Sequence, residues 1–157
     1  MSDSSIKTKT HSIKCLALSG GIGGAKLALG LVHAMLPENL MIVGNTGDDF
    51  QHLGLHISPD LDTLMYTLSG KADQERGWGL AHETWAFMQA LETLGGETWF
   101  SLGDSDLATH IERTRRLRTG ESLTKITLDF CQRLGIPTRI VPVSDEPVHT
   151  IVETPDG

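Results

Sequence analysis

Residues 18–26 read Leu-Ser-Gly-Gly-Ile-Gly-Gly-Ala-Lys and join an apolar run to an amphipathic stretch. The apolar run ends at Ser19, and Leu27, Leu31 and Met35 form one stripe of the stretch that follows. This pattern predicts a strand, a glycine turn and a helix beginning near Ala25. The glycines leave no Cβ between a phosphate and the backbone N–H groups, and the helix directs its positive dipole end to the same place. We therefore expect a phosphorylated ligand at this turn. The residues expected to hold it are Gly20, Gly21, Gly23, Gly24 and Lys26.

The turn departs from two well-known phosphate loops. Counted from Gly20, a Walker A loop would need a glycine at Ala25 and a hydroxyl at Leu27. Counted from Gly21, a dinucleotide-binding fingerprint would need its third glycine at Lys26. A tight strand-to-helix turn without a ligand is therefore the alternative that these residues leave open.

Apolar strands alternate with helical segments along the whole chain. This order is typical of a mostly parallel sheet covered on both faces, so we expect a doubly wound α/β fold. Strands are expected near residues 13–18, 40–43, 98–102, 138–143 and 148–152, and helices near 25–35, 60–69, 82–94, 107–117 and 123–134. Residues 154–157 have the composition of a turn between two strands, so the sheet is expected to be incomplete at its C-terminal end.

Length and composition favour one domain. A chain of 157 residues can bury a single core, and we expect a disordered leader over residues 1–12 and one domain over 13–157. The net charge of -7 argues against a nucleic-acid partner, and no apolar stretch is long enough to span a bilayer. Cys15 and Cys131 have no zinc or redox spacing. We therefore expect a cytoplasmic protein that binds small molecules, with no nucleic acid and no membrane partner.

Acidic residues follow the second expected strand and open the helix that comes after it. Asp48 and Asp49 come after the strand at 40–43, and Asp60 and Asp62 open the next helix. Carboxylates beside a phosphate loop suggest Mg²⁺, which takes one or two protein carboxylates and leaves its other positions to water and phosphate oxygens. The alternative is that Asp60 or Asp62 only caps the helix that follows Pro59.

Several short sequence motifs follow one another through nearly the whole chain. They are Ser19–Lys26, Gly44-Asn-Thr-Gly-Asp-Asp49, Ile57-Ser-Pro-Asp-Leu-Asp-Thr63, Met65-Tyr-Thr-Leu68, Gly77-Trp-Gly79, Glu83-Thr-Trp85, Leu102-Gly-Asp104, Asp106–His110 and Ser144-Asp-Glu146. In these motifs and their order, the chain resembles the 2-phospho-L-lactate transferase (CofD) family. The resemblance implies a Rossmann-like fold, of which this chain covers about the amino-terminal half.

The resemblance also implies an activity in coenzyme F(420) biosynthesis. A 2-phospholactyl or phosphoenolpyruvyl group would pass from a GTP-derived, guanosine diphosphate-linked donor to the deazaflavin 7,8-didemethyl-8-hydroxy-5-deazariboflavin, releasing GMP with Mg²⁺ present. Asp62, Asp48 and Asp49 would then be catalytic, with Asp48 and Asp62 on the metal. The expected substrate contacts, besides the glycine turn and Lys26, are Asn45, Asp60, Thr63, Trp99, Ser101 and Asp104. The full-length enzyme is expected to be a homodimer.

The chain departs from the family pattern at two residues. Ser105 stands where members carry arginine in Gly-Asp-Arg-Asp, and Ser101 stands where many carry a basic side chain. Loss of a guanidinium removes bidentate phosphate recognition, so binding would rely on Lys26 and the backbone. Two alternatives remain, a regulatory protein of the same fold that binds a nucleotide or nucleotide sugar, and an inactive fragment. The arginines at 113–118 are interpreted as a solvated helix end rather than a phosphate or RNA patch.

Overall fold

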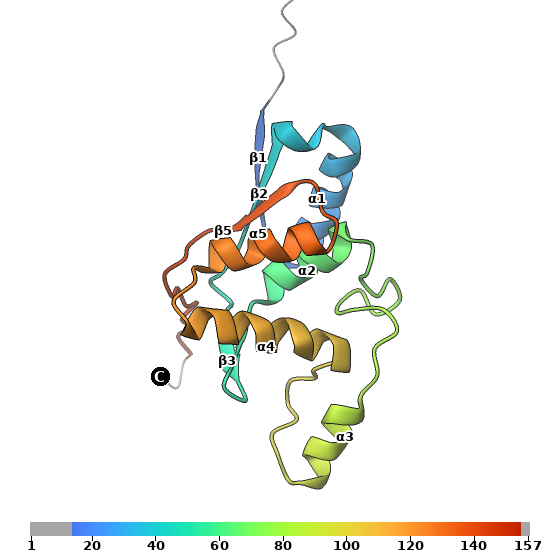
Figure 1. The fold of residues 1–157 in the computed structure, drawn as a ribbon, viewed down its shortest axis with the longest axis vertical. Helices are drawn as coiled ribbons and strands as arrows, with labels where there is room; N and C mark the ends of the chain where they lie inside the picture. The colour runs from blue at the N-terminus through green and yellow to red at the C-terminus, as the bar shows by residue number, and fades with distance from the viewer. Residues whose placement is uncertain (1–13, 155–157) are drawn as a thin grey trace, which may run out of the picture.

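The structure is a computed structural model that describes residues 14–154. Three strands form a parallel sheet in the order β1 (Cys15–Ser19), β2 (Leu40–Gly44) and β5 (Arg139–Pro142). Helices pack beside this sheet (Figure 1). The predicted α/β class with a parallel sheet is confirmed. The expected leader at 1–12 lies outside the described residues, as does most of the turn at 154–157.

Five α-helices and one 3-10 turn are defined among the described residues. They are α1 (Gly21–Ala34), η1 (Pro37–Asn39), α2 (Pro59–Leu68), α3 (Ala86–Thr93), α4 (Asp104–Arg118) and α5 (Leu123–Arg133). All of the expected helices are present. Three of them begin elsewhere than expected. α1 begins four residues before the expected start near 25, α3 begins four residues after the expected start at 82, and α4 begins three residues before the expected start at 107.

The core lies on one side of the sheet. Ala17, Ile42 and Ile140 stand in register across the three strands, and they pack with apolar side chains of α1, α2 and α5. Successive residues of a strand point to opposite faces, so Leu16 and Leu18 point away from this core. These two leucines are 56% and 73% exposed. Helices were expected to cover both faces of the sheet, and within residues 14–154 they cover one.

A short hairpin follows β2 that the sequence did not reveal. Strands β3 (Phe50–His52) and β4 (Leu55–Ile57) pair antiparallel around Leu53 and Gly54. Both turn residues have positive φ, 51° and 72°, which is the geometry of a two-residue type I′ turn. Glycine adopts it freely, whereas leucine at the first position gives no turn signal in the sequence.

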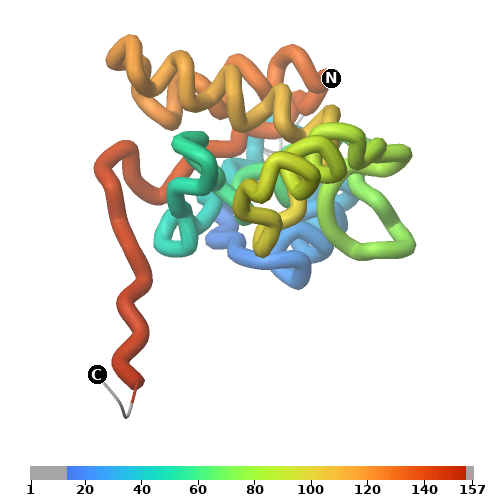
Figure 2. Tube along the Cα trace, turned by 90° about the horizontal axis from the view of Figure 1, so that it is seen from below, coloured from blue at the N-terminus to red at the C-terminus, as the bar shows by residue number. Residues whose placement is uncertain are grey.

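Two expected strands are wrong. Residues 98–102 form no strand, because Trp99 and Phe100 pack against the ring of Phe50 instead of joining the sheet. Residues 148–152 also form no strand, and Ile151 is 86% exposed. Figure 2 shows the segment after β5 as an extended trace leading to the C-terminus. The Thr150 N–H in this segment donates to the Gly47 carbonyl at 2.7 Å, and its hydroxyl donates to Asp48 Oδ1 at 3.0 Å.

Candidate functional site

The glycine segment follows β1 as predicted, but Gly21–Gly24 form the first turn of α1 rather than a separate turn before a helix at Ala25. Gly21 begins α1 with φ of 63°, and a Cβ on Gly24 would lie 2.5 Å from the Oγ of Ser19. These two positions therefore require glycine for the backbone itself. A Cβ on Gly23 would meet no atom within 4 Å. The turn is tight against β1 at Gly24 and open to a ligand at Gly23.

A carboxylate already sits at the start of α1. The Gly21 N–H donates to Asp60 Oδ1 at 2.6 Å, and the Gly24 N–H donates to the Gly20 carbonyl at 3.2 Å. The N–H groups of Ile22 and Gly23 have no carbonyl four residues earlier in the helix. These two groups and the helix dipole remain for an anion, as the sequence predicted.

Asn45 ties Asp60 to Asp48. Its Nδ2 donates to Asp60 Oδ2 at 2.8 Å and to Asp48 Oδ2 at 3.0 Å, while its backbone N–H donates to the Ser19 carbonyl at 2.9 Å. Two carboxylates from different elements therefore share one amide beside the glycine turn. We call Gly21, Asn45, Asp48 and Asp60 the turn cluster. It brings together four of the predicted site residues at the carboxyl ends of β1 and β2.

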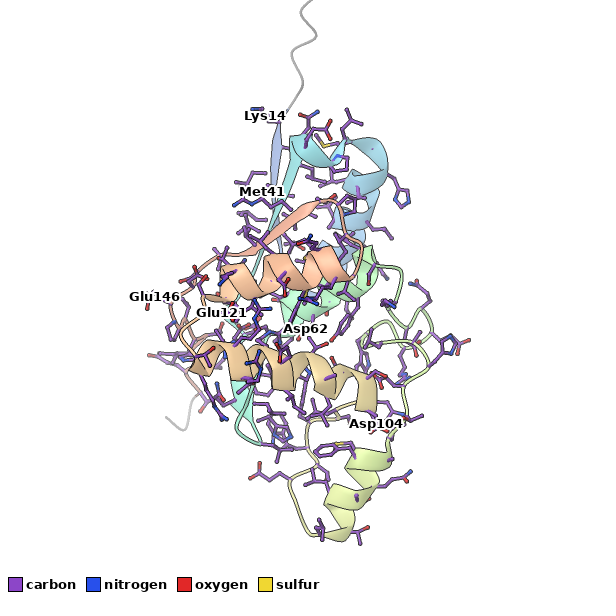
Figure 3. All side chains as sticks on the ribbon, in the orientation of Figure 1. Lys14, Met41, Asp62, Asp104, Glu121 and Glu146 are labelled. Atoms are coloured by element: carbon purple, nitrogen blue, oxygen red, sulfur yellow. The ribbon has the colours of Figure 1, made fainter. Side chains whose placement is uncertain are left out.

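Asp62 lies in a different environment. The Arg113 guanidinium, which is 1% exposed, donates from Nη1 to Asp62 Oδ2 at 3.1 Å and from Nη2 to Asp62 Oδ1. Figure 3 shows Asp62 between α5 and α4 in this view, and the residue is 5% exposed. Burial lowers the pKa of Arg113, but the charge and hydrogen bonds of Asp62, together with the interactions with Tyr66 and Asp49, raise the pKa overall. Both oxygens of Asp62 are occupied by one buried cation.

The buried pair continues into a polar network between α2 and α4. His110 Nε2 lies 3.1 Å from Asp106 Oδ2, and the Tyr66 hydroxyl donates to Asp106 Oδ1. Burial raises the pKa of Tyr66 well above its usual value, and the charges of Asp62 and Asp106 raise it further. Burial also opposes ionisation of Asp106, but His110 outweighs it and the pKa of Asp106 is lowered.

The interpretation of the arginines at 113–118 as a solvated helix end is wrong for two of them. Arg113 and Arg116 are 1% and 8% exposed, whereas Arg115 and Arg118 are exposed. A signal was present in the sequence, because Asp106, His110, Arg113 and Leu117 recur at spacings of four, three and four. That spacing places them on one helical face, which α4 turns toward α2.

Asp49 borders a cavity on the far side of the same loop. Its Oδ2 accepts from the Ser58 hydroxyl at 2.7 Å and lies 3.1 Å from His56 Nε2. Its Oδ1 and the Thr46 hydroxyl are buried without a hydrogen-bond partner. The cavity has a volume of about 480 Å³. Its apolar wall comes from Phe50, Leu117, Leu123 and Val148.

The other predicted contacts lie outside the turn cluster. Lys26 and Ser101 are exposed, and Thr63 is half-buried in the first turn of α2. Trp99 is 68% exposed, with its ring 5.6 Å from that of Phe50 on the cavity wall.

Asp104 caps a helix. It accepts from the Thr84 hydroxyl at 2.6 Å and from the Phe87 N–H at 3.0 Å, at the start of α3. Glu83 reciprocates by accepting from the N–H groups of Ser105 and Asp106 at the start of α4. The Thr84 hydrogen bond lowers the pKa of Asp104. Figure 3 shows Asp104 at the N-terminal end of α4, beside α3 and apart from Asp62.

Among residues 14–154, no three histidine, cysteine, aspartate or glutamate side chains are grouped so as to hold a metal ion. A magnesium site of one or two carboxylates needs no such group, and the hard oxygens of Asp48 and Asp60 have the chemistry for it. No helix in this part of the chain is long and apolar enough to cross a membrane.

Comparison with known proteins identifies one family. The family described as 2-phospho-L-lactate transferase CofD matches residues 15–157. A phosphoenolpyruvate transferase of Kitasatospora aureofaciens is 44% identical over 92% of this chain and 46% of its own length. Proteins of that name from Streptomyces griseus and Mycobacterium tuberculosis strain H37Ra are 45% and 41% identical over 92% of this chain. The chain spans about half the length of these relatives.

Proposed function

The chain belongs to the CofD family, and from this we propose that it carries the phosphate- and metal-binding part of a phosphoenolpyruvyl or phospholactyl transferase. The donor proposed is a guanosine diphosphate linked to the three-carbon acid, and the acceptor is the ribityl hydroxyl of the deazaflavin. The hydroxyl oxygen bonds to the phosphorus that bears the acid, the phosphoanhydride bond breaks, and GMP leaves. The turn cluster is the observation that carries this proposal.

The turn cluster suits a diphosphate because it offers both kinds of charge. The dipole of α1 and the N–H groups of Ile22 and Gly23 favour phosphate oxygens. Asp48 and Asp60 offer the carboxylate oxygens for Mg²⁺. The ion would neutralise the negative charge of the phosphate oxygens around the attacked phosphorus. Holding the donor and the alcohol in line then provides much of the rate enhancement.

Asp60 fits the second metal position better than Asp62 does. The sequence resemblance assigned the metal to Asp48 and Asp62, but Asp62 is already neutralised by the Arg113 guanidinium, whose charge opposes a cation there. The partners of Asp60 are the uncharged Gly21 N–H and the Asn45 amide. Asp60 instead shares the amide of Asn45 with Asp48. We propose that Asp62 contributes indirectly, by fixing the position of α2. A direct catalytic role for Asp62 stays a prediction.

The cavity beside Asp49 is the proposed acceptor site. Its apolar wall and the exposed ring of Trp99 suit a flat heteroaromatic molecule. Within residues 14–154, Asp49 Oδ1 has no hydrogen-bond partner, which supports the proposal that Asp49 accepts the proton of the acceptor hydroxyl. Asp48 and Asp49 are neighbours in the loop after β2, so donor and acceptor would meet at this loop.

Titration of the chain with GDP in the presence of Mg²⁺ tests the proposal. Gly23→Val should abolish measurable binding, because the valine would project into the space left for phosphate, and a Cβ at this position meets no protein atom within 4 Å. Gly30→Val is the matched control, since a Cβ there also meets nothing within 4 Å and the residue lies near the other end of α1. Unchanged GDP affinity in a folded Gly23→Val protein would remove the turn from the site. GDP binding without transfer in a full-length enzyme would favour the regulatory alternative.

A further inference from the structure

His56 stands where the β3–β4 hairpin, helix α4 and the cavity meet. It lies in β4 opposite Gln51 of β3, and its side chain is 24% exposed at the cavity wall. Its main-chain N–H donates to the Thr114 hydroxyl at 2.7 Å, which fixes β4 against α4. His56 is therefore anchored by two neighbouring elements at the point where its ring meets the cavity.

The hydrogen bonds of the His56 ring determine which nitrogen carries the proton. The Gln51 amide nitrogen lies 3.4 Å from His56 Nδ1, and an amide nitrogen only donates. Nδ1 is therefore the acceptor, and a neutral imidazole then carries its proton on Nε2. Nε2 lies 3.1 Å from Asp49 Oδ2, so the ring donates to this carboxylate.

Two donors converge on one oxygen of Asp49. The Ser58 hydroxyl donates to Oδ2 at 2.7 Å and His56 Nε2 donates to the same atom, while Oδ1 has no partner within residues 14–154. The terminal torsion of an aspartate is otherwise broad, so the two donors restrict the rotation of the carboxylate. Both donors are uncharged, unlike the Arg113 guanidinium at Asp62. They orient the carboxylate without neutralising it.

We propose that His56 is a positioning residue for the transfer reaction, acting with Ser58 to hold Asp49 Oδ2 and leave Oδ1 for the proton of the acceptor hydroxyl. This role rests on the proposed function, in which Asp49 accepts that proton. The hydroxyl oxygen bonds to phosphorus as its proton passes to Oδ1, and GMP leaves with the electrons of the broken phosphoanhydride bond. The proton of His56 stays on Nε2, so His56 affects the rate of transfer rather than the binding of either substrate.

Substitution of His56 in a full-length enzyme that contains this chain tests the role. His56→Leu removes the donor, and kcat per folded molecule should fall by about tenfold or more while the KM for the deazaflavin changes less than about threefold. His56→Gln should bring kcat back to within about threefold of the original enzyme, because a glutamine amide can replace the Nε2 donor. His33→Leu is the matched control and should leave kcat unchanged, since His33 is exposed on α1 with its ring at the Leu29 carbonyl.

Nitrogen NMR of the chain itself distinguishes failure of this role from failure of the proposed function. The ring-nitrogen spectrum should show His56 protonated on Nε2 and not on Nδ1 at mildly alkaline pH. A proton on Nδ1, an unchanged kcat in His56→Leu, or equal losses in His56→Leu and His56→Gln would overturn the role of His56. An original enzyme that transfers no group to the deazaflavin would instead overturn the proposed function, and the positioning role with it.

Discussion

Asp60 and Asp62 stand two residues apart on α2 and have opposite surroundings. Asp60 faces the glycine turn, where it accepts from the Gly21 N–H and shares the Asn45 amide with Asp48. Asp62 faces α4, where the Arg113 guanidinium holds both of its oxygens. Residues two apart on a helix project about 200° from each other. The segment Asp60-Leu61-Asp62 therefore contributes one carboxylate to each of two separate sites.

The difference shows how charge is divided between function and structure in this fold. The turn cluster lies at a helix start where Gly21 and Asp48 are exposed, although Asp60 itself is 9% exposed. The Asp62–Arg113 pair is closed, and it ties α2 to α4 across the interior. A buried pair that loses one partner leaves an uncompensated charge, whereas a partly exposed cluster that loses one carboxylate mainly loses a ligand. The following substitutions test that division.

Arg113→Met should have the largest effect. It leaves the Asp62 carboxylate buried without its cation, and we expect a loss of about 3–5 kcal/mol in the free energy of unfolding. Urea denaturation followed by circular dichroism measures it. The double variant Arg113→Met with Asp62→Leu should recover most of the loss, because an apolar pair of similar volume can replace a buried ion pair. A loss below about 1 kcal/mol in the single variant would mean that the pair is not a structural tie.

Asp60→Asn should have the next largest effect, and on binding rather than folding. Removing one carboxylate from the turn cluster should reduce the Mg²⁺-dependent gain in GDP affinity by on the order of tenfold. Titration calorimetry with and without Mg²⁺ provides the measurement. Asp62→Asn is the control, and its Mg²⁺-dependent gain should change less than threefold per folded molecule, about 0.7 kcal/mol. A larger loss of this gain in Asp62→Asn than in Asp60→Asn would indicate that Asp62 binds the metal, as the family resemblance implies.

The sequence predicted the parts of the molecule that depend on local pattern. The glycine segment after β1 was predicted because a strand, four glycines and an amphipathic stretch occur in succession. The gathering of Asp48 and Asp60 was also predicted, because the loop after β2 and the start of the next helix were both expected near the ligand-binding edge of the sheet. These signals need only the residues on either side of the feature.

Features that depend on distant partners were missed. Arg113 lies 51 residues from Asp62, so their pairing could not be seen before the packing of α4 was known. The β3–β4 hairpin was missed because Leu53 adopts a positive φ that its side chain does not favour. Residues 98–102 have the β-prone composition of a strand, but their aromatic rings are used in packing with Phe50. Tertiary contacts decided each of these cases over local propensity.

Asp104→Ala should have the smallest effect and distinguishes a helix cap from a substrate contact. The sequence resemblance placed Asp104 among the substrate residues, whereas its carboxylate accepts from Thr84 and from the first N–H groups of α3. Loss of an N-cap costs about 1 kcal/mol, so the melting temperature should fall by a few degrees while GDP affinity stays unchanged. Glu83→Ala is the matched control, because Glu83 plays the same part at the start of α4 and should give a similar fall. If Asp104→Ala weakened GDP binding and Glu83→Ala did not, the carboxylate of Asp104 would belong to the nucleotide site as well as to α3.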